Sequence, residues 1–235
     1  IEAEVSPMTR PEDPADTRLM AIIHNALKRD LVRVHRPPTE TPAPRGRQRV
    51  ALGQHVTWML DFLHAHHTSE DTHLWPLVRS RNPGSAELLD SMEADHARIA
   101  PAADAAAAAA QDYTTTTGDP ARVALAEALD RLLAVLVPHL DREVAEAMPV
   151  VAATLTNGEW DAIEQEHNIK SKSMRQLAAE GNWLLEDIDP EGYDVVVHKV
   201  PAVIRFILVQ GFGPGYRRRA RVRWTPDGSR TAAVA

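Results

Sequence analysis

The chain has 235 residues, of which 44% are hydrophobic and 25% charged, and its net charge is −7 at neutral pH. This composition is typical of a soluble globular protein with a sizeable core, and its acidity argues against nucleic acid as the main partner. Because there is no cysteine, disulfides, thiolate zinc sites, iron–sulfur clusters and a cysteine nucleophile are excluded, and any metal must be held by His, Asp and Glu. No stretch approaches the about 18 apolar residues of a membrane-spanning helix, and no signal-peptide pattern is visible, so we expect a cytoplasmic protein without a transmembrane segment.

Four long helices are predicted in the first two thirds of the chain. Alanine is abundant and only 5% of the residues are aromatic, which favours helix over strand. Apolar residues that recur every three to four positions, together with start and stop signals, place the helices at residues 14–35, 45–79, 85–112 and 119–154. Because the connecting loops are short, this pattern predicts an all-α, up-down-up-down four-helix bundle over residues 14–155.

The sequence on either side of the bundle is expected to differ from it. Residues 1–13 are expected to be a disordered lead-in or a tag remnant. Residues 156–235 are expected to form a helical extension that packs on the bundle, beginning with a helix from the capping-box sequence at Thr156 to about residue 179. Shorter apolar helices, interrupted by proline and glycine, should follow and cover the bundle with the apolar residues Trp183, Leu184, Leu185, Val195–Val197, Val203, Ile204, Phe206, Ile207 and Leu208.

The chain also has a basic tail, with five arginines between Arg217 and Arg223. Such a cluster can bind an anionic partner, such as a membrane surface or nucleic acid. It can equally be a solvated segment that balances an acidic bundle. We favour the solvated segment.

Two of the predicted bundle helices carry a histidine four residues before a glutamate. The pairs are His66 with Glu70 in the second helix and His139 with Glu143 in the fourth. Residues four apart share one face of a helix, and both pairs fall on the apolar face. A single pair of this kind is more often a surface hydrogen bond. Two such pairs on apolar faces indicate a polar cluster inside the bundle.

The first and third helices each add one histidine on the apolar side, His24 and His96. Either residue alone is read as an ordinary histidine at the edge of a core. Buried carboxylates need compensation, however, because an isolated charge in an apolar core costs several kcal/mol. Two acids that face four histidines are explained together by a divalent metal cluster of iron, manganese or zinc, and two metals bridged by two carboxylates are common inside four-helix bundles.

Four stretches of sequence contain these residues: HNALKRDL from His24, HHTSEDTHLWP from His66, MEADHARI around His96 and HLDREVAEAMP from His139. They resemble the hemerythrin-like (HHE cation-binding) domains, in particular the bacterial, especially actinobacterial, proteins with a C-terminal helical extension. The resemblance covers about residues 14–155. It implies a non-heme, oxo- or hydroxo-bridged centre of two iron ions, with manganese or zinc as weaker alternatives. Its terminal ligands would be His24, His66, His96 and His139, and its bridging ligands Glu70 and Glu143.

One ligand of the family pattern is missing. Oxygen-carrying members have a second histidine four residues from the first on the third helix, where this chain has Met92 and Ala100. Glu93, three residues before His96, or His67, next to His66, could take its place. Otherwise the position is filled by water or left open.

The resemblance implies a function in handling O₂, peroxide or NO. The missing histidine shifts this expectation from reversible oxygen carriage towards reactive chemistry. Two alternatives stay open: a di-iron oxidase or oxygenase that acts on a small organic substrate beneath the extension, and an iron- or redox-sensing interaction protein. If the protein is an enzyme, it is expected to be an oxidoreductase.

The remaining histidines are not expected to be metal ligands. His55 lies eleven residues before His66, which is about 16 Å along a helix axis, too far to ligate the same cluster. His73 lies on nearly the same face as His66 and could control access to the site. His64 and His35 are expected to be solvated.

Overall fold

The computed structural model describes residues 10–39 and 43–225. These residues are mainly helical, and within them the sole β-type pairing is an isolated bridge between Pro14 and Thr156. The predicted all-α fold is confirmed. Most of the expected lead-in, residues 1–9, and residues 226–235 lie outside the described ranges.

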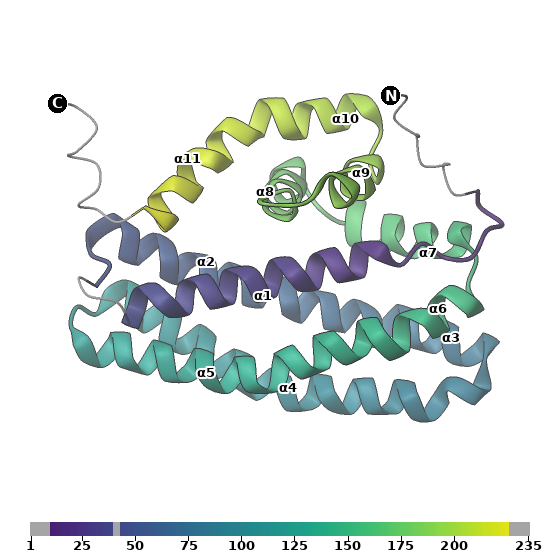
Figure 1. Ribbon diagram of the computed structural model, residues 1–235, viewed down its shortest axis with the longest axis horizontal. Helices are drawn as coiled ribbons and strands as arrows, with labels where there is room; N and C mark the ends of the chain where they lie inside the picture. Colours follow the sequence, from purple (N-terminus) through teal and green to yellow (C-terminus); the bar gives the residue numbers. More distant parts are fainter. Residues whose placement is uncertain (1–9, 40–42, 226–235) are drawn as a thin grey trace.

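The body of the molecule is a bundle of four helical rods (Figure 1). Two of the rods are interrupted by a π-helical turn. The first rod is α1 (Arg18–Thr39) and the third is α4 (Ala86–Thr115). The second consists of α2 (Gly46–Ser69), η1 (Glu70–Leu74) and α3 (Trp75–Arg81), and the fourth of α5 (Asp119–Arg142), η3 (Glu143–Ala147) and α6 (Met148–Thr154). The 3₁₀ turn η2 (Pro83–Ser85) joins the second rod to the third.

Each π-helical turn begins at the glutamate of a predicted ligand pair. The N–H of Trp75 donates to the carbonyl of Glu70, five residues back, and the N–H of Met148 donates to that of Glu143. A proline follows each of these donors, and proline can neither donate a backbone hydrogen bond nor fit easily inside an α-helix. The widened turns therefore lie where the sequence disfavours a regular helix. The uninterrupted helices expected at 45–79 and 119–154 are corrected in this respect.

The second and third rods approach each other closely at Gly53. A Cβ atom there would lie 2.7 Å from the backbone oxygen of Ala110 and 2.5 Å from Cγ2 of Thr114. Ala106 and Ala110 are fully buried in the same core. The alanine tract of α4 therefore has a packing role beyond helix propensity, because its small side chains let α2 and α4 pack with backbones close together.

The extension lies over the side of the bundle formed by α1 and α2 (Figure 1). In the bundle, α1 packs mainly on α5 and α2 mainly on α4, and α1 and α2 touch each other much less. Helices α8 and α9 lie against α1, and α11 lies along α2. The elements are α7 (Asn157–Ile163), η4 (Glu164–Ile169), α8 (Met174–Leu184), α9 (Pro190–His198), α10 (Ala202–Phe206), η5 (Ile207–Phe212) and α11 (Gly213–Trp224).

The extension begins as the sequence predicts but breaks earlier. The capping box of Thr156 and Glu159 is present at the start of α7. The predicted helix to residue 179 does not continue, because Ser173 and Gln176 form a second capping box that starts α8. A serine whose side chain accepts from the backbone three residues later stabilises a new helix start.

The predicted apolar cover is only partly correct. Trp183 is fully buried and Leu208 is 7% exposed, whereas Val203 is 72% and Phe206 67% exposed. Helix α10 therefore exposes apolar side chains to solvent. The basic segment is helical. Arg217, Arg218, Arg219 and Arg221 are exposed, as expected of a solvated segment, whereas Arg223 is buried.

The part of the lead-in that is described is ordered. The backbone carbonyl oxygens of Pro11 and Asp13 accept hydrogen bonds from the N–H groups of Gly158 and Asn157. Residues 10–13 are therefore attached to the start of the extension.

Candidate metal centre

The predicted ligand residues meet in the middle of the bundle. His24 comes from α1, His66 from α2, His96 from α4 and His139 from α5, while Glu70 and Glu143 are the first residues of η1 and η3. Five of the six residues are at most 5% exposed: His24, Glu70, His96, His139 and Glu143. The side chain of His66 is 9% exposed. Four helices thus direct polar side chains into one buried volume.

One half of the cluster contains two histidines. The Nε2 atoms of His24 and His66 lie 3.3 Å apart. Nε2 of His66 is 3.2 Å from Oε1 of Glu70, and Nε2 of His24 is 3.5 Å from Oε2 of Glu143. The other nitrogen of His24, Nδ1, lies 3.2 Å from the carbonyl oxygen of Leu140. If Nδ1 donates to this carbonyl, Nε2 is a free acceptor that points into the cluster.

The other half contains three histidines, including His67. Nitrogen atoms of His67, His96 and His139 lie within 4.8 Å of one another. The rings of His67 and His96 stack with centroids 4.0 Å apart. Nε2 of His96 is 3.7 Å from Oε2 of Glu70, and Nε2 of His139 is 3.5 Å from Oε2 of Glu143. Each glutamate therefore lies between the two-histidine half and the three-histidine half.

The donor set fits a bound cation, as its unsatisfied atoms show. In the described part of the chain, several buried side-chain atoms at this site have no hydrogen-bond partner: Nε2 of His67, Nε2 of His96, both ring nitrogens of His139, and both carboxyl oxygens of Glu70 and of Glu143. Buried polar atoms are nearly always paired, so such a concentration needs an explanation. Imidazole nitrogens and carboxylate oxygens are ligands for iron, manganese and zinc. A metal would satisfy these atoms together.

Burial controls the protonation of the site. Burial lowers the pKa of His24 to about 3, and burial together with the charge of His96 lowers the pKa of His139 to about 3. Burial raises the pKa of Glu70 well above its usual range, helped by the charge of Glu143, and burial also raises the pKa of Glu143. His24 and His139 are therefore neutral at neutral pH and able to ligate. The two carboxylates require a nearby cation to stay ionised together.

Two further acids lie beside the histidines, and the sequence interpretation did not include them. Oδ1 of Asp71 lies 2.7 Å from Nδ1 of His96. Oδ2 of Asp95 lies 3.6 Å from Nδ1 of His139 and 2.9 Å from Nη2 of Arg142. A carboxylate hydrogen-bonded behind a ligating histidine fixes its ring orientation and tautomer, which applies to Asp71 and His96. Asp95 is too far from His139 for a hydrogen bond and pairs with Arg142. Both acids are sequence neighbours of a predicted ligand, which is the signal that could have identified them.

The structure separates the two candidates for the missing ligand. His67 is 7% exposed and lies inside the cluster. Oε1 of Glu93 instead lies 2.9 Å from Nη1 of Arg79, and its side chain is 38% exposed. Glu93 therefore points away from the site, because an arginine on the outside of the bundle binds it.

Two of the remaining histidines have partners elsewhere. Nε2 of His55 lies 2.7 Å from Oδ2 of the buried Asp30, outside the cluster. The ring of His73 stacks on that of His167 in the extension, with centroids 3.5 Å apart. His73 thus contacts the extension and not the ligands.

A cavity of about 760 Å³ lies between part of the extension and helices α1 and α2, and it reaches the predicted ligands His66 and Glu70. Its lining is mainly apolar, with Met20, Ile23, Phe62, Leu184 and Leu208 among its residues. Charged groups of the extension also line it. Nζ of Lys172 lies 2.6 Å from Oε2 of Glu180, and Nδ2 of Asn168 donates to Oε1 of Glu164 at 3.0 Å. Burial raises the pKa of Glu164 in spite of this hydrogen bond. The candidate metal site thus opens towards a space beneath the extension whose rim includes the exposed residues His64 and Thr68.

Fold and site together define a helical-bundle protein with a buried histidine and glutamate site for metal. The hemerythrin HHE cation binding domain matches residues 15–151, and the chain belongs to this family. Comparison with curated proteins and with solved structures gave no match. Among the described residues, no helix is long and apolar enough to cross a membrane.

Proposed function

We propose that the chain binds two iron ions and uses them to handle O₂, peroxide or NO. The ligands of one ion would be His24 and His66, and those of the other His67, His96 and His139. Glu70 and Glu143 would bridge the two ions, since each lies within 3.7 Å of a histidine from both halves. The observation that carries this proposal is the pair of buried glutamates, whose four oxygens have no hydrogen-bond partner in the described residues.

The residues around the ions would set how they react. Bound iron would supply the change of oxidation state and a binding place for a small oxidant or diatomic molecule. The two-histidine half has fewer protein ligands, and its His66 borders the cavity. A small molecule would therefore arrive on this side. The apolar lining would keep the number of water molecules there low, and Asp71 would hold His96 in place.

Metal analysis and rapid kinetics test the proposal. We expect the iron-reconstituted protein to hold two tightly bound ions per chain and to react with O₂ or peroxide in stopped-flow absorption measurements. His64→Ala is a matched control, because His64 is an exposed histidine on the same helix as His66. A single tightly bound ion per chain, or equal iron loss in His64→Ala and His66→Ala, would contradict the proposal.

The cavity supports a second candidate function, the oxidation of a small organic molecule beneath the extension. About 760 Å³ is far more space than a diatomic needs and is in the range of small-molecule sites. Gly181 borders the cavity, and a Cβ atom there would meet no described atom within 4 Å. Gly181 thus offers a position from which the space can be filled without a clash.

Two substitutions of Gly181 separate the candidates. Gly181→Phe should fill part of the cavity and weaken binding of an apolar fluorescent probe, whereas Gly181→Ala should leave it unchanged. If the cavity serves only diatomics or peroxide, both variants should react with them at the rate of the wild type. Organic oxidation that persists at an unchanged rate in Gly181→Phe would argue against a substrate site in the cavity.

A further inference from the structure

A row of aromatic rings leads from the candidate metal centre to the outside of the bundle. The ring of Phe62 lies 6.1 Å from that of His66, nearly parallel to it. The ring of Trp183, from the extension, lies 5.1 Å from Phe62 and 5.1 Å from Trp58. Trp58 is only half-buried and also lines a surface hollow between α2 and α4. The row thus connects a predicted ligand to the surface. Phe62 and Trp58 lie 6.2 Å apart, and the fully buried Trp183 lies closer to each of them than they lie to each other.

Trp183 differs from other tryptophans of the chain in its hydrogen bond. Its indole N–H donates to Oδ2 of Asp30 at 3.0 Å. Trp75, Trp160 and Trp224 also have buried indole N–H groups, but these have no partner within residues 10–39 and 43–225. A fully buried carboxylate against one indole is therefore a specific feature of Trp183.

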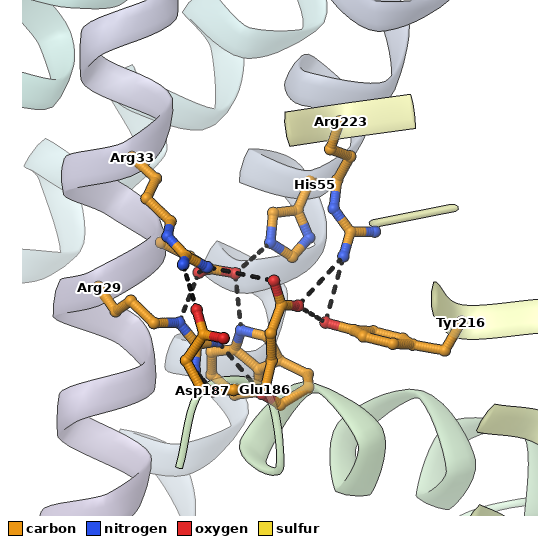
Figure 2. Close-up of polar contacts among 9 residues, drawn as sticks. Arg29, Arg33, His55, Glu186, Asp187, Tyr216 and Arg223 are labelled. Carbon is orange, nitrogen blue, oxygen red and sulfur yellow. Dashed lines mark hydrogen bonds and ion pairs between the residues drawn. The ribbon is translucent and has the colours of Figure 1, made fainter. Parts of the chain in front are cut away.

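Asp30 is held in its charged form by a polar network that includes Arg29 and His55, both labelled in Figure 2. Besides Trp183, it lies 2.7 Å from Nε2 of His55 and 2.8 Å from Nε of Arg29. Burial alone would raise the pKa of Asp30, but the hydrogen bonds from His55 and Arg29 outweigh burial and hold the pKa below its usual range. Arg29 contacts Oδ1, whereas the indole shares Oδ2 with His55. A carboxylate therefore faces the indole N–H at neutral pH.

This arrangement suits the loss of one electron by Trp183. Indole is the neutral aromatic side chain that is most easily oxidised, and the product is a radical cation with an acidic N–H. A positive charge on an unpartnered indole in the core would carry the desolvation cost of an isolated ion. At Trp183, the negative charge of Asp30 would stabilise the positive charge across the existing hydrogen bond. Trp75 and Trp160 have no such acceptor among the described residues.

We infer that Trp183 is a redox-active residue that relays single electrons between the metal centre and a reductant at Trp58, with Asp30 as its positioning partner. One electron passes from Trp183 to the oxidised centre, by way of the Phe62 and His66 rings. A one-electron reductant in solution then returns one electron to Trp183 through Trp58, which restores the neutral indole. This inference rests on the proposed redox function of the centre.

The same network also attaches the extension to the bundle, and the test must distinguish the two roles. Nη2 of Arg29 donates to the backbone carbonyl of Trp183 at 3.2 Å, and Nη1 of Arg33 lies 3.1 Å from Oε1 of Glu186 (Figure 2). The hydroxyl of Tyr216 donates to Oε2 of Glu186 at 2.5 Å. None of these contacts requires the indole N–H. A purely structural network would therefore keep them in Trp183→Phe and would predict no change in radical chemistry.

The experiment uses full-length protein loaded with iron(II) and mixed with hydrogen peroxide in the absence of added reductant. Samples frozen at increasing times are examined by electron paramagnetic resonance, and oxygenated tryptophans are located by peptide mass spectrometry. We expect a tryptophan radical in the wild type and its loss in Trp183→Phe. The matched control is Trp75→Phe, which removes a fully buried indole outside the row and should keep the radical. In Trp58→Phe the radical should form and then decay more slowly when a reductant is added.

The possible results decide whether Trp183 is an electron relay or has a purely structural role. An unchanged radical in Trp183→Phe, or as much oxygenation at Trp75 as at Trp183, overturns the relay. If Trp183→Phe does not fold, two other measurements test the relay: the rate at which the radical decays in Trp58→Phe, and the positions of oxygenated tryptophans in the wild type. Zinc-loaded protein should show no radical, because zinc has no redox chemistry. Wild type that takes up iron and reacts with peroxide without forming a radical contradicts the relay alone. Wild type that takes up no iron contradicts the proposed function first and removes the electron acceptor of the relay.

Discussion

The imidazole rings of His67 and His96 stack with their centroids 4.0 Å apart and their planes 8° from parallel. A histidine of α2 thereby lies beside the single histidine of α4. If His67 is a ligand, His67→Ala should lower the iron content of the reconstituted protein from two ions towards one, because the three-histidine half loses a donor. Metal analysis after dialysis against a weak chelator measures this loss.

Two variants control that experiment. Glu93→Ala should keep both ions, because Glu93 is bound to Arg79 outside the cluster. Asp71→Asn should weaken iron binding about 10- to 100-fold without removing a ligand, which is the usual effect of losing an outer carboxylate. Iron content that is unchanged in His67→Ala would remove His67 from the ligand set.

Glu143 is expected to destabilise the metal-free protein. It is fully buried, its pKa is raised by burial, and its two oxygens have no partner among the residues described. Replacing buried charged groups by apolar residues of similar volume often stabilises a protein by about 1–4 kcal/mol. Glu143→Leu should therefore raise the denaturant midpoint of the metal-free protein and abolish the further stabilisation that iron gives to the wild type. A lower midpoint in metal-free Glu143→Leu would show that Glu143 is not strained without metal.

Two helical glycines should respond in opposite directions to alanine. Gly181→Ala should stabilise the protein by about 0.5–1 kcal/mol, because alanine favours helix and its Cβ would meet no described atom within 4 Å. Gly53→Ala should destabilise it by about 1–3 kcal/mol, because its Cβ would lie 2.7 Å from the backbone oxygen of Ala110 and force α2 and α4 apart. Urea unfolding of the two variants measures both values. Effects of the same sign would contradict the packing described for α2 and α4.

His55 should make stability depend on pH. Burial lowers its pKa below the ordinary value of 6.5, although Asp30 opposes this shift and the charge of Arg223 adds to it. In the unfolded chain His55 takes up a proton below about pH 6.5, whereas in the folded protein it stays neutral to lower pH. The contribution of His55 to the free energy of unfolding is therefore complete above about pH 6.5. Below that pH the free energy of unfolding falls by up to about 1.4 kcal/mol per pH unit because of His55.

The control for this prediction is His55→Gln, whose amide can still donate to Asp30. The free energy of unfolding of the metal-free proteins should fall less steeply in this variant than in the wild type between about pH 7.5 and 5.5. The histidines of the metal site add the same dependence to both proteins, so the difference isolates His55. Equal slopes would show that His55 does not titrate between the two states.

Helix positions and the face of each ligand pair could be predicted from the sequence, because they follow from apolar spacing alone. The choice between His67 and Glu93 could not, since both lie near the apolar face and the presence of Arg79 opposite Glu93 depends on how the rods pack. Asp71 was missed for a related reason. In a regular helix Asp71 points about 100° away from Glu70, and the widened turn changes where it lies. The break before α8 was missed because the capping sequence at Ser173 is short and lies inside a helical pattern.

The widened turns η1 and η3 position the predicted ligand glutamates, but the bundle does not need them in order to fold. A ring closed over five residues holds one residue more than the α-helical ring, so each of the two rods contains an extra residue at its ligand glutamate. Removing Thr72, an exposed residue of η1, would let the second rod run as a plain α-helix and leave Trp75 and Val78 in register with the core. The side chains of the turn itself, Glu70 and Asp71 among them, would be re-aimed. Deletion of this one residue is therefore expected to disturb the proposed ligand set while the four-helix bundle stays folded.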